Sequence, residues 1–514
     1  MMLISAFICF LGLNLCTLIY LTSPKTRLPR NIPVVPLYTL VYDILRGRSR
    51  VEFYNTRVRH LAETAGAVGI WHDGQWVVLA TKPEFVSRVF KNEGQLLEKN
   101  GLYHRVPGGI FAWLFGENII DSDGGLHRFF TQVVKPGILR RFSIKYMRVR
   151  SALLAEELYQ QQTQAPSSTS GTSVGEHIWR WAIAIFGVYF LDLEFHPWDL
   201  DFRQYSIQQI IIAHNQSPMG RLTGLFPVLD RLPWRWGTTQ RTLTRFGKVE
   251  NLVLSNVHDQ IRRKPAIPDP KECDKLIHHL NRAYADGSLS NFHYRSNLKQ
   301  LFVAGHENVE MVAISAMLEL AKNPGIQQNL YTELTQSLGP DYSAEDVDTL
   351  PLLTSVIYEA LRLYPPLITL ANRRAKSSMQ LGDGITVPRG TLIAWHSYGT
   401  HTDPQYWGPA AMEFRPDRWG SDCAVIQREF RIRQARGMYF PFGLHSRRCL
   451  GSRFALIQLK VVLCELVREL EWDLPRDYQT SLSTGTLLAP KDCQLVIRKR
   501  SEGAERMHAS LTTK

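Results

Sequence analysis

Cys449 lies in a basic, glycine-containing loop directly before a strongly apolar segment. The loop reads PFGLHSRRCLG over residues 441–451, so Arg447 and Arg448 precede the cysteine. A thiolate that binds iron must stay deprotonated, and helix-start amides and nearby cations favour that state. Glycines in such a loop let the backbone approach a planar group. A thiolate metal ligand is therefore one interpretation of Cys449, and a plain buried thiol between arginines is the other.

Two further motifs precede the cysteine loop in the chain. Glu359 and Arg362 in EALR stand three residues apart, so they share one face of a helix. Arg418 follows in FRPDRW. Such charges alone would also suit a surface ion pair. Their order, EALRLYPP, then FRPDRW, then the cysteine loop, resembles the cytochrome P450 family, and the resemblance extends from the amino-terminal apolar run to about residue 500.

The resemblance implies a role for each residue of the cysteine loop. Cys449 matches the thiolate ligand of the heme iron in F-x-x-G-x-R-x-C-x-G. Arg447 would then pair with a heme propionate, and Phe442 would lie beside the thiolate. His445 departs from the pattern, because the family usually has glycine there. By the same resemblance, Glu359, Arg362 and Arg418 form a buried triad behind the heme.

The segment AGHEN, Ala304 to Asn308, resembles the family's distal motif A-G-x-[DE]-T. In that motif the glycine, here Gly305, lets oxygen and substrate approach the helix, and an acid and an alcohol relay protons. Asn308 replaces the alcohol, and an amide is a poor proton carrier, so Glu307 and ordered water would have to do more. This permits hydroxylation through water, and also oxidative coupling of phenols. A zinc site of the H-E-x-x-H type would need a second histidine where Glu310 stands.

Two weaker matches concern the heme propionates. GGLHRFF at 124–130 resembles the helix whose Trp or His and Arg bind them, so His127 and Arg128 are candidates. Thr131 stands where a further arginine is expected. In LITLANRRAK, one of the two adjacent arginines is expected to meet a propionate; Arg373 is the candidate, and the choice between it and Arg374 stays open.

The elements that must position these residues are mainly helical. Residues 67–80 predict a β-hairpin, and Pro83 begins a helix after it. Further helices are predicted over 291–322, over 352–363 and, apolar on nearly every face, over 454–470. We expect a mainly α fold with a minor β region, the cytochrome P450 fold, as one catalytic domain over residues 37–500, followed by a polar tail at 501–514.

The amino-terminal residues 1–22 carry no charged side chain and are long enough to cross a bilayer, which takes about 20 residues. The basic, proline-rich segment 23–36 follows as a connector, and its Lys and Arg residues favour a cytoplasmic catalytic domain. A cleaved signal peptide is the alternative, but it normally carries basic residues before its apolar core. The resemblance implies a single-pass protein of the endoplasmic reticulum membrane.

The net charge of +13 suits an anionic partner, such as a membrane surface or an acidic protein. No zinc-finger spacing or basic zipper is present, so a nucleic-acid partner is not expected. Seven cysteines without a C-x-x-C pair do not predict a disulfide framework. By resemblance, an NADPH-cytochrome P450 reductase docks on a basic face made by Lys135, Arg140, Arg141 and Arg448, and the protein is a monomer.

These observations predict a heme-thiolate monooxygenase that oxidises a small organic substrate with electrons from NADPH. The chain resembles microsomal P450s of fungal secondary metabolism. An amino-acid-derived aromatic would suit Asn308, by hydroxylation or oxidative coupling. Two alternatives stay open: a reductase-independent enzyme that is peroxide-driven or isomerising, and a non-catalytic heme sensor or carrier.

Overall fold

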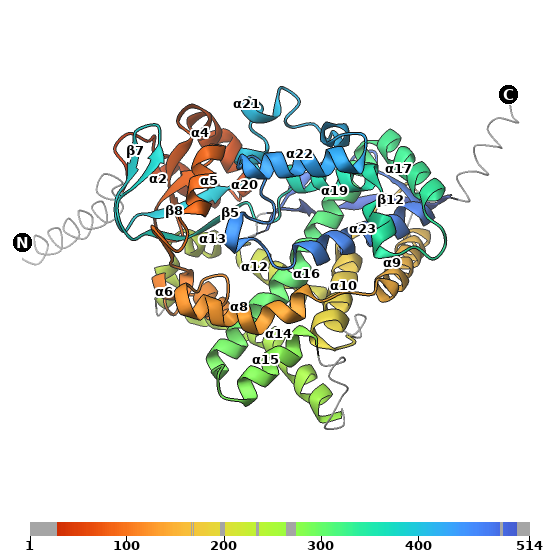
Figure 1. Cartoon of the computed structure of the whole chain (residues 1–514), viewed down its shortest axis with the longest axis horizontal. Coiled ribbons are helices and arrows are strands. Elements are labelled where there is room, and N and C mark those ends of the chain that lie inside the picture. The colour runs from red at the N-terminus through yellow and green to blue at the C-terminus, as the bar shows by residue number, and fades with distance from the viewer. Residues whose placement is uncertain are drawn as a thin grey trace, which may run out of the picture.

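The computed structural model describes residues 28–165, 167, 169–195, 201–232, 236–263, 274–483 and 487–500. Helices dominate it. Strands β7 (Ile385–Val387) and β8 (Leu392–His396) lie with the amino-terminal helices at one end of the molecule, and β12 (Gln494–Lys499) lies toward the other end (Figure 1). The prediction of a mainly α fold with a minor β region is confirmed. The predicted anchor at 1–22, the first part of the connector and the tail at 501–514 fall outside the described residues.

The main helices are α2 (Leu37–Leu45), α3 (Arg50–Phe53), α4 (Arg59–Ala65), α5 (Pro83–Lys91), α7 (Ile110–Phe115), α8 (Gly124–Leu139), α9 (Lys145–Thr163), α10 (Gly175–Phe186), α11 (Phe202–Tyr205), α12 (Ile207–His214), α13 (Pro218–Leu225), α14 (Trp236–Arg263), α15 (Leu276–Ala285), α16 (Asn291–Lys322), α17 (Pro324–Ser337), α19 (Pro351–Leu363), α22 (Cys423–Ala435) and α23 (Ser452–Glu469).

Helix α16 runs through the centre of the body, with the bounds that the sequence predicts (Figure 1). Ser290 caps its first turn by accepting a hydrogen bond from the amide of His293 at 3.2 Å. Every residue from Val309 to Ala321 is buried. Within the described ranges, α16 is the one helix long and apolar enough to span a membrane, and 72% of that apolar window is buried inside the protein. It is therefore a core helix.

A five-stranded sheet has the order β1-β2-β8-β5-β3. Its strands are β1 (Ala67–His72), β2 (Gln75–Ala80), β3 (Leu97–Lys99), β5 (Thr369–Ala375) and β8 (Leu392–His396). The predicted hairpin is β1 with β2, and its turn places Asp73 and Gly74 at positive φ. These are residues that tolerate the left-handed region. The edge strand β3 pairs antiparallel with β5 and lies close to the chain segment that precedes α8.

The segment from Leu28 to Pro36 makes a turn and then packs on the sheet through a parallel bridge between Val34 and Gly69. The Val35 amide donates to the carbonyl of Gly69 at 2.9 Å, and the Gly69 amide donates to Pro33 at 2.8 Å. A Cβ on Gly69 would lie 2.5 Å from the end of the Leu28 side chain, so a larger residue would displace that side chain. The described part of the connector is thus fastened to strand β1.

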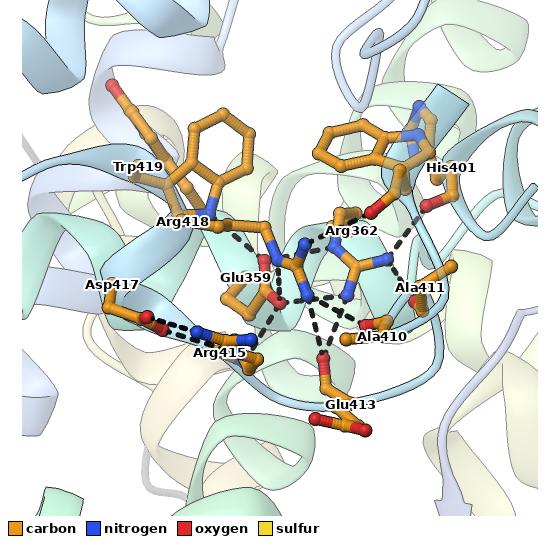
Figure 2. A network of polar contacts seen from close by, with 12 residues as sticks. Glu359, Arg362, His401, Ala410, Ala411, Glu413, Arg415, Asp417, Arg418 and Trp419 are labelled. Carbon is orange, nitrogen blue, oxygen red and sulfur yellow. Dashed lines mark hydrogen bonds and ion pairs between the residues drawn. The ribbon is translucent and has the colours of Figure 1, made fainter. Parts of the chain in front are cut away.

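Helix α19 carries a buried carboxylate that joins it to a distant loop (Figure 2). Glu359 accepts hydrogen bonds from Arg362 at 2.8 and 2.9 Å and from Arg418 at 2.8 Å. The indole of Trp419 and the backbone amide of Arg415 also donate to it, each at 3.0 Å. The side chains of Glu359 and Arg362 have no exposed surface. The predicted triad therefore forms a closed ionic network around one buried charge.

We predict that Glu359→Gln lowers the free energy of unfolding by about 3–5 kcal/mol, because it leaves buried guanidinium groups without their counter-charge. Urea denaturation followed by circular dichroism measures the change. The matched control is Asp417→Asn, which removes a pair with Arg415 whose side chains are 64% and 51% exposed. That variant should cost less than about 1 kcal/mol. Equal small losses in both variants would show that the buried network does not stabilise the fold.

Candidate active site

The cysteine loop folds back on itself between α22 and α23. The Cys449 amide donates to the Phe442 carbonyl at 2.8 Å, and the Gly443 amide donates to Phe440 at 3.0 Å. Gly443 has a φ of 70°, a conformation that favours glycine. Helix α23 begins at Ser452, three residues after the cysteine. The predicted entry of the loop into a core helix is thus what the structure shows.

Opposing effects act on the pKa of the Cys449 thiol. Burial raises its pKa, while the backbone amides of Gly451 and Ser452 and the charge of Arg448 act in the opposite direction. The residue nonetheless keeps accessible surface, whereas Cys464 and Cys493 are buried. The helix-start amides and the cation favour a thiolate but do not outweigh its desolvation. A bound metal cation would supply the missing positive charge, so the site fits a thiolate ligand better than a free thiolate.

His445, which stands where the family pattern has glycine, adopts a backbone conformation that glycine favours. It has a φ of 53°, in the left-handed region where glycine is at ease. A non-glycine residue there costs about 1–2 kcal/mol. Its side chain is exposed, so no packing clash adds to that cost. The loop therefore holds His445 in a backbone conformation that favours glycine.

One stripe of α16 keeps accessible surface in the middle of an otherwise buried helix. Leu301, Ala304, Gly305 and Asn308 are half-buried, as is Val303, while Phe302, His306 and Glu307 are buried. The spacing i, i+3, i+4, i+7 puts the four on one face. The Asn308 amide donates to the Ala304 carbonyl at 3.2 Å, which uses one of its two N–H groups. Asn308 thus belongs to the face of α16 that a bound molecule can reach.

Gly305 has a packing reason that the sequence motif did not reveal. A Cβ at this position would lie 2.0 Å from the ring of Phe186 on α10. Contact between α10 and α16 therefore requires the absence of a side chain here. The motif predicts that Gly305 gives oxygen and substrate access to the helix. The structure shows that the same glycine also allows α10 and α16 to pack closely, and no local sequence pattern could have identified this contact.

Glu307 points away from Asn308, toward the start of α12. Its carboxylate accepts from the Gln208 amide at 3.0 Å and lies 3.4 Å from the Ser206 hydroxyl. Burial raises the pKa of Glu307 to about 7, against these hydrogen bonds, which lower it. Glu310, one turn further, is also buried, and burial together with the Glu307 charge raises its pKa well above the usual range. Within the described ranges no hydrogen bond joins Glu307 to Asn308, so any relay between them needs water.

Arg447 and Arg373 converge on one buried carboxylate, Glu93. An Arg373 nitrogen lies 3.1 Å from it and Arg447 Nε lies 3.6 Å from it. Of the two adjacent arginines that could meet a propionate, Arg373 is the one in this cluster. It is buried there, while Arg374 is half-buried at the next position of β5. In the described part of the chain, Nε of Arg373 is buried without a hydrogen-bond partner.

The neighbouring helix α8 contributes less charge than its motif suggests. His127 lies in the field of the cluster, and burial, followed by the charges of Arg447 and Lys99, lowers its pKa to about 4. Its Nε2 is 3.4 Å from the Thr131 hydroxyl. Arg128 is exposed. Sequence reasoning missed Lys99 and Glu93 because neither belongs to a motif. A site with this surplus of positive charge fits the carboxylates of a heme.

A family model for Cytochrome P450 matches residues 33–497. The chain belongs to the cytochrome P450 family. It is similar to the cytochrome P450 monooxygenase xanG of Aspergillus fumigatus, at 33% identity over 475 residues, 91% of this chain and 87% of that protein. It is also similar to cytochrome P450-DIT2 of Saccharomyces cerevisiae, at 26% identity over 94% of this chain and 97% of that protein.

Membership of the P450 family confirms the predicted cofactor, a thiolate-ligated heme, and makes this protein an oxidoreductase of the monooxygenase class. The residues gathered above fit that group. An accessible cysteine precedes a helix start, the stripe on α16 that includes Asn308 can be reached, and the cationic cluster includes Arg447 of the cysteine loop.

The raised pKa of Glu307 predicts a pH-dependent stability. The folded protein holds this proton up to about pH 7, whereas a free glutamate releases it near 4.3. This contribution is therefore fully present below the unfolded pKa and is lost as the pH rises through about 7. Relative to the wild type, Glu307→Gln should gain about 3 kcal/mol of stability between pH 5 and pH 8.

Urea midpoints at the two pH values measure this difference. Glu156→Gln is the control, because Glu156 is exposed on α9 and its hydrogen bond with Lys499 lowers its pKa further below this window. The control should follow the wild type. A parallel pH dependence in the wild type and Glu307→Gln would mean that Glu307 is already ionised at pH 5.

Proposed function

We propose that this P450 is a heme-thiolate monooxygenase in which Cys449 is the axial ligand of the heme iron. One observation carries the proposal: the accessible Cys449 thiol meets the first amides of α23, two residues after an arginine that reaches a buried ionic cluster. Metal-binding thiolates need such amides, and a heme needs cations for its propionates. A plain buried thiol would need neither.

Each predicted cofactor residue takes a role in this arrangement. Arg447, Arg373 and His127 are proposed to bind the propionates, and Phe442 lies in the turn that accepts the Cys449 amide. Arg128, exposed on α8, is proposed for a propionate oxygen that reaches solvent. When bound, the heme supplies a redox-active iron at which dioxygen is activated.

The protein's own contribution to the chemistry is proton supply and positioning. Glu307 holds a proton near neutral pH, and its contacts to α12 keep it on the buried side of α16. Asn308 and Gly305 stand on the accessible stripe, where the amide can hold a water molecule. An arrangement without a proton-carrying alcohol suits hydroxylation through water, and also oxidative coupling of phenols. We propose a small, amino-acid-derived aromatic substrate of secondary metabolism.

An NADPH-dependent, flavin-bearing reductase is the proposed electron donor. Lys135, Arg141 and Arg448 are exposed and can meet an acidic surface. Arg140, the fourth member of the expected face, is engaged: it donates to the Tyr189 carbonyl at 2.6 Å and its guanidinium stacks over the Phe142 ring. Residues 1–22 are proposed as the anchor that holds the protein in the endoplasmic reticulum membrane, with the catalytic domain in the cytoplasm.

Turnover of candidate phenolic substrates tests this function. We expect product with NADPH and reductase, and a reductase-driven rate about tenfold lower in Lys135→Glu/Arg141→Glu, because charge reversal slows docking. The peroxide-driven rate of that variant should stay at the wild-type level. The control is Arg203→Glu on α11, which is exposed and remote from α8 in the sequence.

Two results would contradict the proposal in different ways. Turnover with peroxide but none with reductase would identify the reductase-independent alternative. Heme binding without turnover of any substrate by either route, and without a substrate-induced spin shift, would favour a sensor or carrier.

A further inference from the structure

A cavity of about 140 Å³ lies between α2, α3, β1 and α13, beside the start of strand β5. A cavity of about 150 Å³ is enough to hold one benzene ring. Apolar side chains form much of its wall, among them Ile44, Ile70 and Leu225. The indole of Trp71, also in the wall, donates to the Leu225 carbonyl at 2.8 Å and ties β1 to α13. The cavity therefore has a fixed apolar wall of a size that suits a single ring.

Cations outnumber carboxylates on the same wall. Among the described residues, four formally charged side chains line the cavity: Arg48, Arg50, Asp73 and Arg221. The Asp73 carboxylate contacts two basic side chains, His72 Nδ1 at 3.0 Å and an Arg105 nitrogen at 3.4 Å. Burial would raise the pKa of Asp73, but the charges of His72 and Arg105 outweigh it and lower the pKa. Asp73 is therefore an ionised carboxylate whose charge the protein already matches.

A second carboxylate, Asp43, is fully buried behind the wall. Arg48 and Arg57 each lie 3.0 Å from it, so Arg48 has its counter-charge there. Glu52, on α3, accepts the Ser49 amide at 2.6 Å and caps its own helix. Neither acid is paired with the two remaining cations of the wall, on α3 and α13.

Those two cations are Arg50 and Arg221. The Arg221 guanidinium donates to the carbonyls of Leu45 at 2.8 Å, Asn215 at 3.1 Å and Gln216 at 3.0 Å. These bonds fix its position but supply only partial negative charge. Arg50 is exposed at the first position of α3 and makes no ion pair or side-chain hydrogen bond with any described residue. The wall thus presents two guanidinium groups that lack a carboxylate.

We propose that this cavity binds a small aromatic acid, with Arg50 and Arg221 as the cations that recognise its carboxylate. Guanidinium groups match the planar geometry of a carboxylate, and the apolar wall receives the ring. The cavity is smaller than the pockets of about 300–1,000 Å³ that hold drug-sized ligands, which favours a single-ring acid over a lipid.

The cavity also adjoins the strand that carries a proposed heme contact. Thr369 lines it and begins β5, and Arg373 follows on the same strand. The inference rests on the proposed function and narrows its substrate class to an amino-acid-derived aromatic that keeps its carboxylate.

Equilibrium dialysis of the full-length holoprotein with 4-hydroxyphenylacetate, and separately with its methyl ester, tests this site. The two probes share the phenol ring and differ in charge. We expect the wild type to bind the acid at least about tenfold more tightly than the ester, because charged hydrogen bonds hold the carboxylate. Arg50→Gln and Arg221→Gln should each lose most of this preference, whereas Arg50→Lys, which keeps the charge, should retain it.

The matched control is Arg46→Gln. Arg46 is an exposed cation at the end of α2 that stacks over the Tyr42 ring at 5.0 Å and is not part of the cavity wall. This variant should keep the wild-type preference for the acid. Circular dichroism checks that each variant is folded. Should Arg221→Gln fail to fold, Arg50→Gln still decides, because Arg50 has no described partner to lose.

Equal affinity of the wild type for acid and ester, or an Arg50→Gln variant that keeps the wild-type preference, would overturn the site. Turnover of both probes with reductase, without any preference for the acid, would refute the site and leave the proposed function intact. A preference that Arg50→Gln abolishes, without turnover of either probe, would support the site and count against the proposed oxidation of phenols.

Discussion

The carboxylate of Glu359 is the interaction on which the placement of the cysteine loop depends. A buried negative charge has to be matched by cations and hydrogen bonds, and here the chain supplies them from α19 and from the loop around Arg418. Arg362 also donates to the carbonyls of His401 and Ala411. The neutral His401 ring in turn accepts the Phe440 amide at 2.9 Å. One buried charge is thereby linked through two residues to the start of the turn that carries Cys449.

Two regions of this protein have an electrostatic setting that a bound heme would complete. At Cys449, the amides of α23 favour a thiolate, but burial still raises the thiol pKa. Around Glu93, cations outnumber the buried carboxylate. A bound heme would compensate both regions, because its cationic iron would stabilise the thiolate and its anionic propionates would neutralise the cations. Arg447 belongs to the second region and stands two residues from the thiol, so the cysteine loop connects the two.

Motifs and periodicity predicted the features that depend on local sequence. The bounds of α16 and the hairpin at 67–80 follow from patterns that lie within a few residues of one another. The triad of Glu359 with the distant Arg418 was expected from the resemblance to the family, not from a local pattern. The cofactor and the fold class followed from the order of such motifs along the chain.

Features that depend on long-range packing could not be read in this way. The need for Gly305 lies in a ring on α10, the partner of Glu307 is the start of α12, and the opposition of Lys99 to Arg373 is a matter of strand register. Arg140 looked like a free surface cation, but a carbonyl and an aromatic ring hold it. In each case the deciding neighbour lies far away in the sequence.

The most direct test of the account is the absorption spectrum of the reduced protein with carbon monoxide. We expect the wild type to show the long-wavelength Soret band of a thiolate-ligated heme, and Cys449→Ala to lose it while remaining folded. Cys423→Ala, which removes another free thiol, should keep the band. A folded wild type that binds heme but lacks this band, or a Cys449→Ala variant that retains it, would contradict the assignment of Cys449 as the ligand.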